Sequence, residues 1–133
     1  MDKYKIAVVT NNKINLSKHF GKSKYFAVYE INGNEISEPY YIDFPDNEAH
    51  NPKKQRLSIG IIDGGSGNRD YHDVLLSLIK DCKVVLSGGM GEGMKEKLLK
   101  YDFTAILTAE RDIKNAVQSY VNGTLINQDD LIH

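Results

Sequence analysis

KVVLSGGMGEGMKEKLLKYDFTAIL, residues 83–107, is the stretch that decides the fold. Short apolar segments at both of its ends, KVVLS and FTAIL, are typical of strands that are buried on both faces of a sheet. Between them Met94, Leu98 and Tyr101 recur at helical spacing, after a glycine-rich loop. A strand, a helix and a second strand in this order need a right-handed crossover, so the two strands are predicted to be parallel.

Helical periodicity continues on both sides of this unit. One apolar face precedes it and another follows it: Tyr71, Val74, Leu75, Leu78 and Ile79, then Ile113, Ala116, Val117, Tyr120 and Val121. We expect Asp112 to cap the start of the last helix and Gly123 to end it.

The N-terminal part reads as strands. Residues 4–10 and 25–31 are short and rich in β-branched and aromatic residues, and Asn32-Gly33 is a hairpin signal. A third strand is expected over 35–44, at an edge because Pro39 lacks an N–H donor. The order predicts one domain over residues 1–133, an α/β fold with a mixed five-stranded sheet, an N-terminal antiparallel hairpin and three α/β/α layers.

Charge and cysteine content exclude several classes of function. The chain has 17 basic and 18 acidic residues, and the run 53–56 is taken as its only basic cluster, so neither a nucleic-acid nor a membrane partner is expected. A lone cysteine, Cys82, excludes an intramolecular disulfide and a zinc site of several thiolates. No apolar run approaches the ~20 residues that cross a bilayer, and we expect a cytoplasmic protein.

Three loops should meet at the carboxyl ends of the parallel strands, where open α/β sheets bind ligands: 10–21, 87–93 and 108–112. The loops GGMGEG (88–93) and DGGSGN (63–68) each precede a predicted helix, which suggests either anion binding or a sharp turn. His19 is a metal or cluster ligand, a polar contact for an anion, or a loop histidine satisfied by the backbone. Met90 offers a soft thioether that could touch a sulfide cluster. The acidic residues form no acid/base pair, so no catalytic residue is predicted.

Four segments carry a family likeness: KIAVVT (5–10), HFGKSKYFAVYEI (19–31), DCKVVLSGGMGEG (81–93) and AVQSYVNGTL (116–125). Together they resemble the dinitrogenase iron-molybdenum cofactor biosynthesis family, over nearly the whole chain except roughly residues 43–62. This family contains small carrier and accessory proteins of nitrogenase assembly in nitrogen fixation. The resemblance implies a ribonuclease-H-like fold and a non-enzymatic carrier.

The resemblance also implies a set of site residues. It assigns His19 as a candidate metal or cluster ligand. It assigns a wider cofactor-binding set of His19, Phe20, Gly21, Gly88, Gly89, Met90 and Gly91. The implied cargo is an iron-sulfur or iron-molybdenum cluster or its precursor, and the implied partners are metallocluster-assembly or nitrogenase-like proteins. Two alternatives remain open: an enzyme or sensor that binds a phosphorylated small molecule, and a regulatory protein-interaction module.

Overall fold

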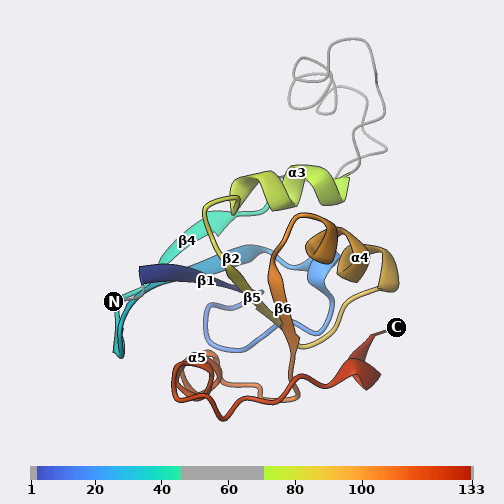
Figure 1. Ribbon diagram of the computed structural model, residues 1–133. Helices are drawn as coiled ribbons and strands as arrows, with labels where there is room; N and C mark the ends of the chain where they lie inside the picture. The colour runs from blue at the N-terminus through green and yellow to red at the C-terminus, as the bar shows by residue number, and fades with distance from the viewer. Residues whose placement is uncertain (1–2, 46–70, 133) are drawn as a thin grey trace.

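The computed structural model describes residues 3–45 and 71–132 and shows helices packed on a mixed sheet (Figure 1). The strands are β1 (Lys3–Thr10), β2 (Tyr25–Asn32), β3 (Glu35–Ile36), β4 (Tyr40–Asp43), β5 (Val84–Ser87) and β6 (Thr104–Leu107). The helices are α3 (Tyr71–Leu78), α4 (Glu92–Lys100) and α5 (Ile113–Val121), with short 3₁₀ turns η1 (Phe20–Lys22) and η3 (Asp129–Leu131). The basic run at 53–56 and the glycine cluster at 63–68 lie outside the described residues.

The sheet combines an antiparallel and a parallel part, as the sequence predicts. Its strand order is β3-β2-β1-β5-β6, with β4 also paired to β2. β2 and β3 form the antiparallel hairpin predicted at Asn32-Gly33, and β2 also pairs antiparallel with β1. β5 runs parallel to both β1 and β6. The strands β1, β5 and β6 therefore all end at the same edge of the sheet.

The predicted count of five strands is wrong, because the third strand is broken into two pieces. β3 pairs with the end of β2, and β4 pairs with its beginning, so both lie along the same edge of β2. Ser37 still bonds to Glu30 through its backbone N–H and its hydroxyl. Pro39 follows, and the ladder stops there because proline has no N–H to donate.

Helices cover both faces of the sheet. In the view of Figure 1, α3 and α4 lie above the sheet and α5 lies below it. Leu75 and Leu76 of α3 and Leu98 of α4 join one apolar cluster, whereas Ala116 and Val117 of α5 join the other. This arrangement fits the predicted three layers, while the ribonuclease-H-like label stays a prediction.

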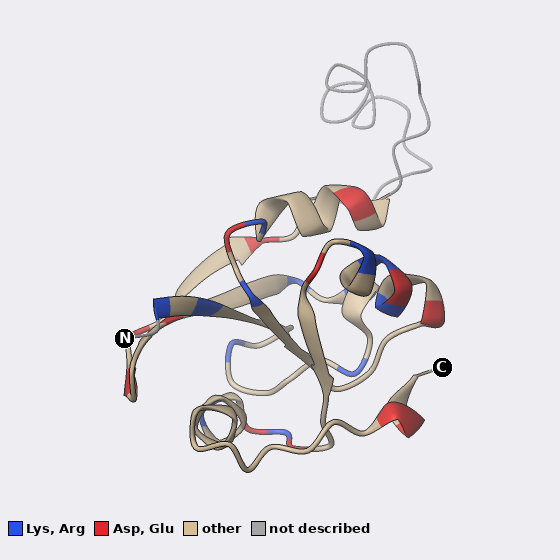
Figure 2. Cartoon of the chain, in the orientation of Figure 1, with Lys and Arg blue, Asp and Glu red and all other residues tan. Residues whose placement is uncertain are grey.

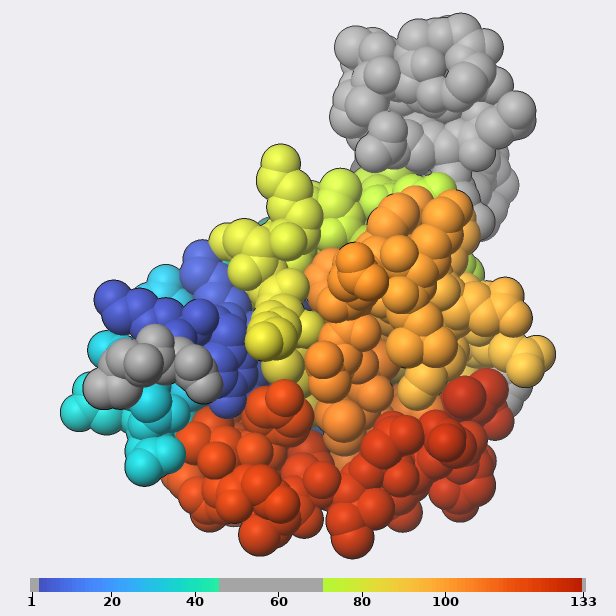
Figure 3. Space-filling view, viewed as in Figure 1, coloured from blue at the N-terminus to red at the C-terminus, as the bar shows by residue number. Residues whose placement is uncertain are grey.

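The ends of α5 confirm the predicted caps. Asp112 Oδ2 accepts a hydrogen bond of 3.0 Å from Asn115 N–H, and Gly123 has φ +77°, a left-handed conformation that favours glycine. Beyond α5 the chain returns along the lower side of the molecule, drawn in red in Figure 3. There Gln128 N–H donates to Leu107 O, which covers the outer edge of β6. No helix in the two described ranges has the length and apolarity needed to span a bilayer.

Candidate functional site

The loop after β1 is fixed by its own polar side chains. Thr10 Oγ1 donates to Asn15 O over 2.6 Å and accepts from Lys13 N–H over 2.9 Å. Asn12 Oδ1 accepts from the N–H groups of Ile14 and Asn15 at 2.9 and 2.8 Å. These bonds hold Lys13 at φ +69°, an uncommon conformation for a residue with a side chain. A short side-chain network therefore sets the path of the chain toward His19.

This loop is in direct contact with the glycine bend after β5. Gly88 N–H donates to Ser17 O over 2.8 Å, and Phe20 N–H donates to Gly89 O over 3.2 Å. A Cβ atom on Gly88 would lie 2.8 Å from the same Ser17 oxygen, closer than side-chain carbons approach. Only glycine lets the two backbones come this close. The segments that carry His19 and the glycine bend are thus neighbours, as the sequence predicts.

The third loop, between β6 and α5, joins the other two. Arg111 O accepts from Leu16 N–H at 2.8 Å and from Asn15 Nδ2 at 3.2 Å. Ile113 N–H donates to Ile14 O at 3.0 Å. All three loops therefore converge beyond the carboxyl ends of β1, β5 and β6, where open α/β sheets bind ligands.

A crevice of about 230 Å³ opens at this meeting point, between the loop after β1 and the loop before α5. Its lining residues are Asn11, Asn12, Asn15, Leu16, Ser17, Lys18, His19 and Arg111. Lys18, His19 and Arg111 are exposed, and within the ranges 3–45 and 71–132 no acidic residue lines the crevice. The crevice therefore offers cationic and amide donors to a negatively charged guest.

Two backbone N–H groups of the glycine bend already form hydrogen bonds within the protein. Gly88 N–H is bound to Ser17 O, and Gly89 N–H is bound to Ser87 Oγ at 3.2 Å. Ser87 Oγ in turn donates to Gly89 O at 2.7 Å. These two N–H groups favour the interpretation of a sharp turn over that of an anion cradle. Gly91, which is the N-cap of α4, and Gly21, in η1, are both partly exposed.

Phe20 and Met90 lie in the apolar core, each with 1% of its surface exposed. Phe20 packs edge-to-face on Phe26, with ring centroids 5.8 Å apart. In this conformation neither side chain lines the crevice, and Phe20 anchors the turn that follows His19. A contact of Phe20 or Met90 with a cofactor therefore stays a prediction. It would need either a changed conformation or a contact through backbone atoms.

A protein-built metal site is not visible in the parts of the chain that the structure describes. No three His, Cys, Asp or Glu side chains come together there in a way that could hold a metal ion. Cys82 precedes β5 and so lies at the opposite edge of the sheet, where burial raises the pKa of its thiol to about 12. Among the described residues that line the crevice, the imidazole of His19 is therefore the candidate metal ligand.

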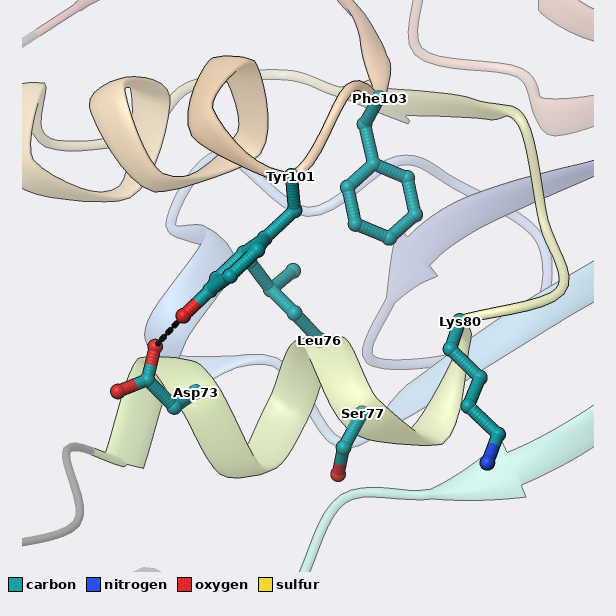
Figure 4. Close-up of a pocket in the computed structure, with 6 residues that line it drawn as sticks. All are labelled: Asp73, Leu76, Ser77, Lys80, Tyr101 and Phe103. Carbon is teal, nitrogen blue, oxygen red and sulfur yellow. Dashed lines mark hydrogen bonds between the residues drawn. The ribbon is translucent and has the colours of Figure 1, made fainter.

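A larger hollow, of about 390 Å³, lies between α3 and the end of α4 and contains none of the predicted site residues (Figure 4). At one end Asp73 Oδ1 accepts from Lys97 Nζ at 2.9 Å and from Tyr101 Oη at 3.0 Å. Burial alone would raise the pKa of Asp73, but these two hydrogen bonds and the charges of Lys97 and Lys100 together outweigh it and lower the pKa. The carboxylate is therefore already engaged in joining α3 to α4.

The sequence interpretation missed Lys18 and Arg111, and it was wrong about the basic residues. Lys13, Lys18, Lys22 and Lys24 follow β1 within a segment, residues 3–29, that contains no Asp or Glu. The run at 53–56 is therefore not the only basic cluster. A local count of charges would have found these lysines. A local count of charges would not have found Arg111, because only the fold brings it close to the loop after β1.

One protein family matches nearly the whole chain. Its model, described as dinitrogenase iron-molybdenum cofactor, matches residues 2–123. A comparison with curated proteins found none that matches. Among solved structures the chain is similar to PH0822, with 22% identity, a TM-score of 0.69 and 96% of each chain covered.

Two further solved structures share the fold. The dinitrogenase-like protein MJ0327 of Methanocaldococcus jannaschii has 14% identity and a TM-score of 0.64, over 96% of this chain and 97% of that one. The apo form of the orange protein from Desulfovibrio gigas has 18% identity and a TM-score of 0.63, over 94% of this chain and 92% of that one. At these identities the likenesses show the fold alone.

Proposed function

The chain belongs to the dinitrogenase iron-molybdenum cofactor family, and we propose that it is a non-enzymatic cytoplasmic carrier of an iron-sulfur or iron-molybdenum cluster, or of a precursor. The cargo sits in the crevice beside His19. The observation that carries this proposal is the lining of that crevice, which among the described residues has three exposed basic side chains and no acid. Its partners are metallocluster-assembly or nitrogenase-like proteins.

The donors in the crevice suit an anionic cargo better than a bare metal ion. A metal ion needs several anionic or imidazole ligands, and His19 is the one such ligand among the lining residues. A cluster that already carries its sulfides needs few protein bonds. Lys18 and Arg111 supply charge-assisted hydrogen bonds to sulfide or oxygen, and the imidazole of His19 binds an iron through a deprotonated ring nitrogen. In this proposal the bend at Gly88, Gly89 and Gly91 supports the loop that carries His19.

Binding by this ligand set is weak. Structural clusters are held by several cysteine thiolates, whereas the one cysteine of this chain is buried at the other edge of the sheet. A cargo held by one imidazole and a few charged donors can leave without breaking several metal–thiolate bonds. A carrier must release its cargo, so this ligand set fits transfer rather than storage.

The test is anaerobic reconstitution of the protein with iron and sulfide, followed by metal analysis and visible absorbance. We expect uptake by the wild type and loss of uptake in His19→Ala. The matched control is His72→Ala in α3, because it removes an imidazole from an element that does not line the crevice. Full uptake by His19→Ala, or equal loss in both variants, would contradict the assignment of His19.

A measurement of thermal stability tests the alternative of a phosphorylated ligand. That alternative predicts thermal stabilisation by inorganic phosphate or a phosphate ester, without iron. The bonds already made by the N–H groups of Gly88 and Gly89 count against it, since these donors would have formed the phosphate cradle. Stabilisation by phosphate together with no iron uptake would replace the carrier proposal.

A further inference from the structure

Positive charge is concentrated on one loop of a chain whose overall charge is near zero. The whole chain has a formal net charge of -1, yet residues 3–29 contain no Asp or Glu. Figure 2 shows the loop between β1 and β2 with blue segments and no red ones. We define the basic rim as Lys13, Lys18, Lys22, Lys24 and Arg111. It surrounds His19 and the crevice.

Backbone hydrogen bonds and pocket linings place these residues on or beside one loop. Lys18 and Arg111 line the crevice itself. Lys22 N–H donates to His19 O at 3.1 Å, and Lys24 N–H donates to Thr10 O at 3.2 Å, so both lysines stay close to the same loop. Lys22 and Lys24 also border an adjacent hollow of about 400 Å³, whose lining includes one acid, Asp43.

The charges of the rim are not neutralised within the described ranges 3–45 and 71–132. Other lysines form ion pairs there: Lys5 with Asp81, Lys97 with Asp73 and Lys95 with Asp129. No ion pair in these ranges involves Lys18, Lys22, Lys24 or Arg111. Lys13 lies between two aromatic rings, 4.8 Å from the ring centroid of Tyr25 and 4.9 Å from that of Tyr41.

Two carboxylates flank Arg111 in sequence and keep their negative charge there, although in the described part of the chain both bond to backbone N–H groups rather than to a cation. Glu110 Oε2 accepts from Asp112 N–H at 3.1 Å, and Asp112 Oδ2 caps α5. Desolvated or paired cations would not need an outside partner, whereas a set of solvent-facing cations around a binding site creates a field that attracts negative charge. The rim is therefore a surface that an anionic partner would recognise.

Apolar groups stand within this rim. Ile14 is 62% exposed although it is a large aliphatic residue, and Tyr41 is 38% exposed next to Lys13. Protein interfaces are enriched in aromatic residues and arginine, which fits Tyr41 and Arg111. A nucleic acid or an anionic membrane would extend beyond the rim onto a molecule with as many acids as bases.

We infer that the basic rim docks an acidic surface of a partner protein, the one that delivers or receives the cargo. This inference rests on the proposed carrier function. Charge steering would bring the partner to the crevice quickly and in one orientation, while Ile14 and Tyr41 make the short-range contact. The docking surface and the cargo site then share one loop, so that the partner meets the cargo directly.

The experiment uses the apo protein, with decaglutamate as the probe for an acidic protein surface. Amide chemical shifts are followed in NMR spectra as the peptide is added, at low and at physiological salt. We expect shifts confined to the loop after β1 and to the residues around Arg111. The double variant Lys22→Glu/Lys24→Glu should bind about tenfold more weakly. The matched control is Lys80→Glu/Lys83→Glu, which makes the same change of net charge at exposed lysines outside the rim.

A double dissociation separates this inference from the carrier function. Lys22 and Lys24 do not line the crevice, so their variant should lose peptide binding and keep iron and sulfide uptake. His19→Ala should lose uptake and keep peptide binding. If the rim variant and its control bind the peptide equally weakly, the effect comes from net charge alone, and the inference is overturned. Tighter binding of short duplex DNA or of phosphatidylglycerol vesicles than of decaglutamate would overturn it in favour of another class of partner.

Discussion

Replacement of Gly88 by alanine tests the contact on which the site depends. Gly88 sits where the bend after β5 meets the loop that carries His19, and its N–H donates to Ser17 O at 2.8 Å. An added Cβ would also lie 2.8 Å from this oxygen and 3.4 Å from Lys18 Cα. The neighbour is backbone rather than the end of a flexible side chain, so the whole loop has to move.

The size of the effect follows from that displacement. Ordinary carbon contacts begin near 3.4 Å, so Ser17 O must retreat by about 0.6 Å, the difference from 2.8 Å. This stretches the hydrogen bond that the same oxygen accepts, which is worth about 1 kcal/mol. Overpacking against a fixed backbone adds about 1–3 kcal/mol. We expect Gly88→Ala to lower the free energy of unfolding by about 2–4 kcal/mol, and Tm by about 8–16 °C for a domain of this size.

Urea unfolding measures this change, and Gly93→Ala is its matched control. Gly93 lies within α4, has no left-handed φ, and would give an added Cβ no neighbouring atom within 4 Å. Alanine there should raise stability by about 0.5–1 kcal/mol, because it favours the helix. In Gly88→Ala the midpoint should fall without a change in m, and iron uptake should fall with it. An unchanged midpoint in Gly88→Ala would show that the loop and the bend are not in contact, and the described site would be lost.

Three further predictions concern parts of the fold away from the crevice. Asp73→Asn should lower the free energy of unfolding by about 1–2 kcal/mol, because it removes the ion pair to Lys97. Since the pKa of Asp73 is lowered, this contribution is present above the ordinary value of 3.8 and is lost as the pH falls through the lowered pKa. Urea midpoints of wild type and variant, measured across that pH range, would show the loss. Cys82, with a thiol pKa of about 12, should react with a thiol reagent at pH 8 far more slowly in native than in urea-unfolded protein, and equal rates would contradict its burial. Asp112→Ala should lower stability by about 1 kcal/mol through loss of the cap of α5, as thermal unfolding would measure, whereas Asp112→Asn should largely keep it.

Local patterns carried the parts of the fold that the sequence could predict. The apolar faces of α3 and α5 depend on spacing within one helix, and the parallel pair β5–β6 depends on the handedness of a short crossover. The cap at Asp112 is a contact over three residues. Each of these features is determined by neighbours in the chain, which a periodicity can report.

Features that depend on distant residues were missed or misjudged. The break at Pro39 depends on which edge of β2 the chain follows, so one predicted strand became β3 and β4. Arg111 reaches the crevice only because its carbonyl binds the loop of Leu16, far away in sequence. Met90 was predicted from its soft sulfur, but its burial is set by packing between β5 and the helices. Chemistry read from a residue type does not reveal whether the fold exposes it.

Net charge alone does not report the charge of one face, because it averages over the whole surface. At physiological ionic strength the Debye length is about 8 Å, so a partner that approaches one face is influenced by the charges of that face. The acids that balance the total of -1 lie outside residues 3–29, which include most of the basic rim. A near-neutral chain can therefore present a cationic crevice, and this is the combination that a carrier of anionic cargo needs. Local charge holds the cargo and attracts an acidic partner, while the balanced total limits binding to unrelated polyanions.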